Sequence, residues 1–309
     1  MSYINWGSES PEQLALRRMI EEQALYEQAV RSARARAGQA PGVAGGGGDP
    51  LTGLYGVAAD GLIYSLSRDE ANWQYNYDSF PGFTQITLNT DDGYVYAVLE
   101  FAETYFIRID QTTREFTFIE NDIDDYSTKG ASSLYYEGAG NFIYLDNSDK
   151  SDVSSIIRIE LDGGSPEAAI ATVVSEVNSV ITGYTLRNIF LYDGATWAIA
   201  ITDTSPFGCI TGPFDIDAGE FIYSNILDIS PSDSNINLAY VFSTVEYRGI
   251  VYVCAGYTDQ LDNFIVGLFK MDTETGGASA PYYLTFVKEL MIDSAGGAPI
   301  LSITHFQKI

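Results

Sequence analysis

Five short stretches rich in β-branched and aromatic residues recur along residues 51–309, and their spacing limits the folds open to the chain. Their starting points lie 40, 48, 55 and 53 residues apart. Such compositions are typical of strands. A strand-bearing unit repeated every 40–50 residues, roughly, indicates a ring of small sheets in which each unit supplies one sheet. The stretches begin at Leu54, Tyr94, Phe142, Trp197 and Ile250.

Turn-forming residues rich in Gly, Asp or Asn precede the last four stretches, and a further strand precedes each turn. The turns are 91–93, 138–141, 193–195 and 247–249, and the strands before them are 85–89, 133–137, 188–192 and 239–245. Third strands are expected at 62–67, 105–110, 156–161, 220–224 and 264–271, and outer strands at 73–77, 116–119 and 283–286.

The Leu54 stretch has no strand before it, because a glycine tract precedes it. Residues 300–306 are apolar and β-branched, and they follow the fifth outer strand. We therefore predict that Ile300, Ile303 and Phe306 lie in a strand beside Leu54 that closes the ring. This predicts a mainly β domain, a five-bladed β-propeller, over residues 51–309. The alternatives are a β-sandwich or two stacked β domains.

Residues 1–37 predict an amphipathic helix whose start is a capping box, Ser10-Pro11-Glu12-Gln13, and whose end is Gly38. Residues 38–50 hold four consecutive glycines between prolines and predict a flexible linker. We expect the helical segment to bind a partner protein, with self-association or folding back as alternatives. The binding residues would be Ile4, Trp6, Leu16, Met19, Ile20, Tyr26 and Val30.

The opening residues 3–13, the Arg- and Ala-rich helix and the glycine tract resemble the start of virion structural proteins of tailed bacteriophages. The resemblance covers roughly the first 48 residues and implies a particle component anchored to capsid or tail by its N-terminal peptide. The β pattern also resembles the five-bladed propellers of sugar-binding lectins and some glycoside hydrolases. Fold alone does not settle function.

The charge of the β region excludes some partners. Residues 51–309 hold 11 basic and 36 acidic side chains. A domain this acidic repels phosphates and anionic lipids, so we expect neither nucleic acid nor a membrane surface as partner. No apolar run approaches the roughly 20 residues of a membrane span. Acidic Glu9 and Glu12 stand where a secretion signal has basic residues, which favours a protein made in a cytoplasm.

Motifs that carry chemistry are missing. His305 is the single histidine, so a zinc site built on several histidines is excluded, and we expect it to be structural. Phosphate-binding loops, dinucleotide fingerprints and G-x-S-x-G are absent. Glycoside hydrolysis needs two carboxyl groups across a cleft. The candidates on inner turns are Asp91, Asp92, Glu137 and Asp193.

Two oxygen-rich stretches, 146–152 and Asp215-Ile216-Asp217 with Glu220, could hold Ca²⁺. The first has Ser151 where a calcium loop of the EF-hand type needs Gly and lacks the terminal Glu, so we expect solvated loops and no cofactor. Trp73, Tyr75 and Tyr77 alternate along an outer strand and could stack on sugars, although contact with a neighbouring blade is favoured.

The sequence thus predicts a non-enzymatic structural component of a phage particle, assembled in the host cytoplasm and present in multiple copies. Residues 1–50 would contact other virion proteins while the acidic propeller is displayed. The first alternative is a carbohydrate- or host-receptor-binding module that binds a host-surface glycan. The second alternative is a glycoside hydrolase.

Overall fold

The computed structural model describes the β region with gaps. The described residues are 51, 53–58, 63–66, 71–73, 83–100, 104–110, 113, 115–119, 131–146, 154–161, 168–177, 183–202, 208–222, 226–233, 236–258, 264–272, 282–292 and 298–305. The expected helix and linker, with their seven binding residues, lie outside this set. So do Phe306, Tyr75, Tyr77 and residues 147–152.

The described residues form 22 strands in four hydrogen-bonded sheets, and no helix occurs among them. The first sheet has the order β21-β22-β1-β2-β3, with β1 Leu54–Ala58, β2 Ile63–Ser65, β3 Ala71–Trp73, β21 Met291–Ile292 and β22 Ala298–His305. The second contains β4 Phe83–Leu88, β5 Val95–Glu100, β6 Thr104–Ile109 and β7 Phe116–Ile119. The third contains β8 Ala131–Gly138, β9 Asn141–Asp146, β10 Ser154–Leu161 and β11 Ala169–Val177.

The fourth sheet has nine strands and consists of two antiparallel runs. The first run is β12 Tyr184–Tyr192, β13 Ala195–Thr202, β14 Cys209–Asp215 and β16 Leu227–Pro231, with the short β15 Glu220–Phe221 beside β14. The second run is β17 Asn237–Tyr247, β18 Ile250–Thr258, β19 Phe264–Asp272 and β20 Tyr282–Glu289. A parallel pairing of β16 with β20, Ile229 opposite Tyr282, joins the two runs.

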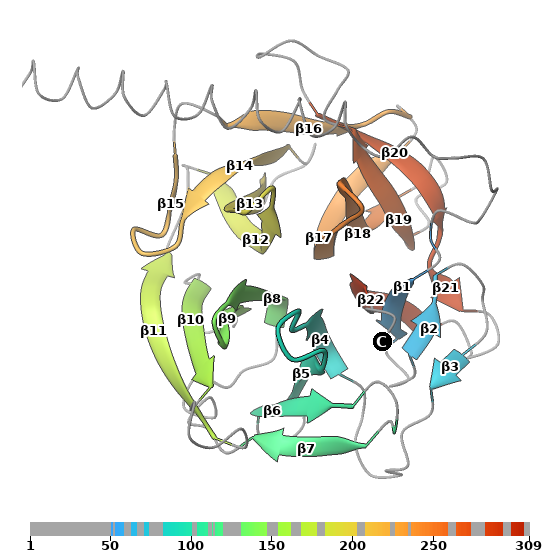
Figure 1. The fold of residues 1–309 in the computed structure, drawn as a ribbon. Helices are drawn as coiled ribbons and strands as arrows, with labels where there is room; N and C mark the ends of the chain where they lie inside the picture. Colours follow the sequence, from blue (N-terminus) through green and yellow to red (C-terminus); the bar gives the residue numbers. More distant parts are fainter. Residues whose placement is uncertain are drawn as a thin grey trace, which may run out of the picture. The chain divides into compact units, whose positions relative to one another are not determined.

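The runs stand around a common axis, with β22, β4, β8, β12 and β17 innermost (Figure 1). Each of these strands packs against the next, and β17 packs against β22. Sheets arranged around an axis in this way are a β-propeller arrangement, so the prediction of a mainly β domain is confirmed. A two-layered sandwich does not describe it.

The terminal strand lies where the sequence predicts it. Strand β22 pairs antiparallel with β1, and Leu54 lies opposite His305, Gly56 opposite Ile303 and Ala58 opposite Ile300. Leu54 and Ile303 are both buried. The first and last described strands of the domain therefore share one sheet.

One strand prediction is wrong. Residues 220–224 were expected to be a third strand, but the third strand of that run is β14, which pairs with β13 so that Pro213 lies opposite Trp197. Glu220 and Phe221 form only the short β15 beside it. Gly212 and Pro213 lower the strand propensity of this segment, whereas its burial between neighbouring strands overrides that preference.

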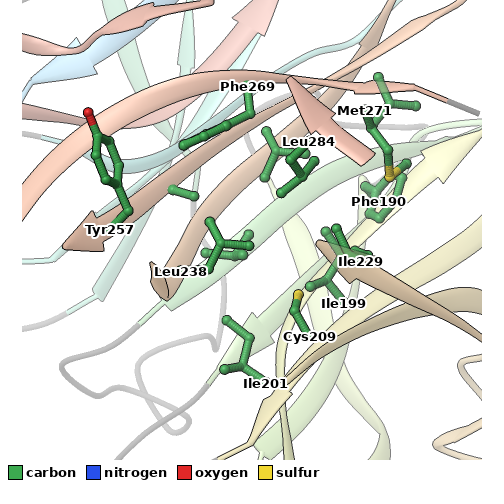
Figure 2. Close-up of a cluster of buried hydrophobic side chains, with 14 of the residues drawn as sticks. Phe190, Ile199, Ile201, Cys209, Ile229, Leu238, Tyr257, Phe269, Met271 and Leu284 are labelled. Atoms are coloured by element: carbon green, nitrogen blue, oxygen red, sulfur yellow. The ribbon is translucent and has the colours of Figure 1, made fainter. Parts of the chain in front are cut away.

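The core lies between the sheets, and the middle strands are buried on both faces. In β13, Trp197, Ile199 and Ile201 pack against β17–β20, while Ala198 and Ala200 pack toward β8–β10. Figure 2 shows the first of these clusters, in which Ile199, Ile201 and Cys209 face Leu238, Phe269 and Leu284. Burial on both faces explains why these strands are apolar throughout instead of alternating.

Each innermost strand carries a buried polar side chain directly after a β-bulge. The pairing register shifts immediately before these residues, which we call the polar waist: Gln85, Ser133, Asn188, Ser243 and Ser302. A bulge leaves a backbone group outside the regular ladder. Three waist serines each accept a hydrogen bond from the next innermost strand around the ring, from Ile86 N to Ser302 Oγ (3.0 Å), Ile189 N to Ser133 Oγ (3.1 Å) and Ile303 N to Ser243 Oγ (3.2 Å).

Candidate functional site

The inner hairpins, which follow β4, β8, β12 and β17, meet at one end of the ring. Three of them are tight turns in which both central residues have positive φ: Ala139-Gly140, Asp193-Gly194 and Arg248-Gly249. This geometry is a type I′ turn, whose twist matches that of the flanking strands. Asp193 N donates to Glu246 Oε2 at 2.9 Å, and Tyr135 Oη and Thr196 Oγ1 are 2.9 Å apart. Neighbouring hairpins are therefore linked by hydrogen bonds.

Asp91 and Asp92 lie exposed in the turn between β4 and β5, and each is held by a tyrosine. Tyr136 Oη, from β8, donates to Asp91 Oδ2 at 2.5 Å. Tyr96 Oη, from β5, donates to Asp92 Oδ2 at 2.8 Å, and Tyr94 N donates to Asp92 Oδ1 at 2.8 Å. Two adjacent carboxylates thus have fixed orientations at the surface.

The hydroxyl groups of Tyr96 and Tyr136 keep the protons that they donate to the two carboxylates. Both side chains are buried, with the phenol of Tyr136 also accepting a hydrogen bond from Gly140 N at 3.0 Å. Burial, and then the hydrogen bond to Asp91, raises the pKa of Tyr136. Burial, and then the hydrogen bond to Asp92, likewise raises the pKa of Tyr96. A phenol whose charged form is disfavoured keeps its proton at physiological pH.

Glu137 directly follows Tyr136 at the end of β8. Its Oε2 lies 3.2 Å from Arg158 Nε, and the Arg158 Nη2 atom is 3.9 Å from Asp217 Oδ1. Both side chains of the Glu137–Arg158 pair are about one quarter exposed, at 29% and 27%. The hairpin end of the third sheet therefore presents an oriented carboxylate close to the surface, supported by a guanidinium.

The four carboxylates singled out by the sequence all lie on inner hairpins, as expected. The structure places Asp91, Asp92 and Glu137 on two neighbouring hairpins and Asp193 on the following one. Glu246 and the two tyrosine donors were missed. A signal for Glu246 was present, because Glu137 and Glu246 both stand three residues before the glycine of their turn.

Of the remaining sequence candidates, Asp217 meets this group through Arg158, whereas Asp215 serves its own turn. Asp215 Oδ1 accepts hydrogen bonds from Asp217 N and Ala218 N, both at 3.0 Å, so it stabilises its own turn. Within the described residues no cluster of three or more His, Cys, Asp or Glu could hold a metal. The backbone of His305, in β22, lies opposite that of Leu54 in β1. Trp73 is the last residue of β3. Among the described residues there is also no helix suited to crossing a membrane.

Comparisons with known proteins give structural likeness only. No family model matches the chain, and no curated protein matches it. A periplasmic gluconolactonase of Pseudomonas aeruginosa is 10% identical with a TM-score of 0.47, covering 76% of this chain and 82% of that chain. An endo-1,4-beta-xylanase of Bacteroides thetaiotaomicron is 14% identical with a TM-score of 0.44, covering 70% and 77%. A thermostable family-43 glycoside hydrolase is 11% identical with a TM-score of 0.43, covering 68% and 75%.

Two expectations, that of a non-enzymatic protein and that of a structural component of a phage particle, find no support among these three structures and are not retained. The three are two glycoside hydrolases and a lactonase. Those expectations depended on residues 1–50, outside the described set, and on the absence of catalytic motifs. Missing motifs weigh little here, because carboxylates on separate hairpins come together only in the fold.

Proposed function

We propose that the β domain is a glycoside hydrolase whose reacting carboxyl groups are carried by the inner hairpins. The observation that supports it best is the hydrogen bond from Tyr136 to Asp91, which fixes an exposed carboxylate of one hairpin to the end of the next. Glu137 follows Tyr136 in the chain, so a second carboxylate lies on the same strand end as the phenol. Fixed carboxylates on neighbouring loops suit this chemistry better than mobile ones.

Glycosidic bond hydrolysis requires one carboxyl group that protonates the leaving oxygen and another that attacks the sugar or activates water. We assign this pair to Asp91 and Glu137. Tyr136 contacts Oδ2 of Asp91, which leaves Oδ1 to act on the sugar carbon or the water. Arg158 contacts Oε2 of Glu137, which leaves Oε1 to exchange a proton with the glycosidic oxygen.

The test is release of reducing ends from a panel of neutral polysaccharides by the full chain. Asp91→Asn and Glu137→Gln should each lower the rate by about 100-fold or more, the size of an acid–base contribution. The matched controls Asp228→Asn and Glu289→Gln change exposed carboxylates on β16 and β20, in another sheet than the assigned pair, and should keep full activity. With an aryl glycoside whose leaving group needs no protonation as substrate, azide should restore turnover of Asp91→Asn and Glu137→Gln, and the anomeric form of the glycosyl azide identifies the nucleophile.

Two results would overturn the proposal. One is the absence of reducing-end release from every polysaccharide by a correctly folded protein. The other is hydrolysis that survives both Asp91→Asn and Glu137→Gln.

We also infer that the domain has five blades closed by β22. Support comes from the five innermost strands packing in sequence and from five apolar clusters. Each cluster joins one run of strands to the next. Deletion of a whole run, for example residues 131–177, should abolish cooperative unfolding, whereas a sandwich-like stack would retain a folded remainder.

For residues 1–50 we propose a binding segment for a partner protein, through the seven apolar residues named above. The support is the capping box, the apolar stripe and the glycine linker. Purification of the full chain and of residues 51–309 from the native source should give a co-purifying protein only with the full chain. An identical set of co-purifying proteins would contradict the proposal.

A further inference from the structure

An aromatic group lies at the other ends of the strands, away from the inner hairpins. Phe264 begins β19, while Tyr240 and Phe242 lie in the first half of β17, before its hairpin. Phe264 is 55% exposed. The rings of Tyr240 and Phe242 are 4.8 Å apart, and the guanidinium carbon of Arg187 lies 5.1 Å from the Tyr240 ring. We call Tyr240, Phe242 and Phe264 the aromatic patch.

Two rings of the patch pack directly against the backbone of Gly256 in β18. A Cβ atom at position 256 would lie 2.5 Å from Cζ of Phe264 and 3.2 Å from Cε2 of Phe242. The two rings therefore rest on the glycine backbone, and any side chain there would displace one of them. This contact lets Phe264 lie close to the strand while more than half of its surface faces solvent.

The backbone under the patch is held by a side chain of β4, an innermost strand that is separated from β17 in the ring by β22. Gln85, a member of the polar waist that is only 3% exposed, donates from Nε2 to the Phe242 carbonyl oxygen at 3.3 Å. Phe242 is also the bulge residue of β17, so its position is fixed by both the bulge and the amide. The rings are thus presented on a rigid support, which lowers the entropy cost of binding a ligand.

The negative charge of the domain limits the chemical classes of ligand that the aromatic patch can bind. The domain carries 11 basic and 36 acidic side chains, so an acidic partner is repelled, whereas an uncharged one is not. Aromatic faces combined with a few fixed polar groups are typical of ligand sites. The flat C–H face of a sugar ring stacks on aromatic rings, and its hydroxyl groups are suited to a guanidinium such as that of Arg187.

We propose that the aromatic patch binds sugar rings of a neutral polysaccharide and retains the polymer on the domain. The proposal extends, and rests on, glycoside hydrolysis at the hairpins. The patch and the carboxylates lie at opposite ends of their strands, so a short glycoside reaches only the carboxylates. The patch should therefore matter for polymers and not for small substrates.

The test is native electrophoresis of the full chain in gels that contain one neutral polysaccharide each. The wild type should be retarded by at least one polymer, and Phe264→Ala and Tyr240→Ala should weaken the retardation roughly tenfold, as for an aromatic anchor at an interface. Tyr283→Ala, which removes an exposed aromatic ring on β20, should migrate like the wild type. Hydrolysis of a small chromogenic glycoside should be unchanged in all three variants.

The outcomes separate the two proposals. Retardation that Phe264→Ala abolishes, without any hydrolysis, supports the patch as a glycan site and overturns only the hydrolase. Hydrolysis of polymers by a chain that no gel retards overturns the patch. A second copy of the chain is the competing occupant. Sedimentation equilibrium that shows a dimer in the wild type and a monomer in Phe264→Ala would also overturn the glycan site.

Discussion

Ser133 Oγ accepts a hydrogen bond from the backbone N–H of Ile189, which lies 56 residues further along the chain, at 3.1 Å. The same relationship joins Ser302 to Ile86 and Ser243 to Ile303. In each case a small hydroxyl satisfies an N–H donor on the edge of an innermost strand that faces away from its paired strand. The polar waist therefore links three of the five neighbouring pairs of innermost strands, β22 with β4, β8 with β12 and β17 with β22.

Replacing a waist serine should lower the free energy of unfolding. Ser133→Ala leaves a buried N–H without a partner, which costs about 1–3 kcal/mol. Urea unfolding followed by fluorescence should show a lower midpoint with an unchanged slope. Ser230→Ala, at an exposed serine of β16, is the control and should match the wild type. Equal midpoints for the two variants would show that the waist does not support the fold.

Closure of the ring should be sensitive to charge in β22. Ile303 is 2% exposed, and Ile303→Asp would bury a carboxylate among apolar side chains. We expect a loss of about 4 kcal/mol or more, or failure to fold. Ile170→Asp is the matched control, since Ile170 of β11 is 61% exposed and should tolerate the change. Circular dichroism melting compares them, and similar melting temperatures would argue against closure by β22.

Tyr136→Phe should test the orientation of Asp91, with the loss of the Gly140 N contact measured separately as a change in the urea midpoint. The variant removes the hydroxyl group that donates to Asp91 but keeps the buried ring. We expect polysaccharide hydrolysis to fall about tenfold or more, because the carboxylate loses its fixed orientation. Tyr283→Phe, at an exposed tyrosine, is the control for the loss of a hydroxyl group. An unaltered rate for Tyr136→Phe would remove Asp91 from the proposed mechanism.

Stability should decline at alkaline pH. Burial raises the pKa of the Cys209 thiol from 9.0 to about 12, and burial also raises the pKa of Cys254 and Tyr135. These groups keep their protons in the folded state when the unfolded chain has lost them. The stabilisation is therefore complete below about pH 9 and is lost as the pH rises through the folded values, by about 1.4 kcal/mol per pH unit for each group.

Urea unfolding between pH 8 and 10 measures this slope. Cys209→Ala should reduce it, because one of the two buried thiols no longer titrates, whereas Ser230→Ala should retain the wild-type slope. The comparison concerns slopes, so any constant loss of stability from the missing sulfur does not affect it. A wild-type free energy that stays constant over this range would contradict the burial of the thiols.

Local chemistry explains what the sequence could predict. The Asp193-Gly194 turn has two residues suited to positive φ, the Arg248-Gly249 turn has one in its glycine, and the apolar β18 follows the second turn directly. The position of β22 followed from the missing partner of β1. These features depend on residues that are close in sequence, or on a simple count of strands.

Other features depend on residues that meet only after folding. Strand β14 was misplaced because Gly212 and Pro213 hide a segment that neighbouring strands bury. The polar waist was missed because a buried serine or glutamine in a strand gives no sign of the bulge beside it. The contact of Tyr136 with Asp91 joins residues 45 positions apart, and no motif spans that interval.

The pairing of β1 with β22 also affects the order in which the domain can form. The ribosome adds Ala298–His305 after every other described strand. One edge of β1 therefore has no partner strand until β22 has been synthesised. Until then the open edge of β1 and the apolar faces beside it remain available to other chains. The domain should therefore reach its native state only after translation of this strand, and its nascent form should depend on chaperones.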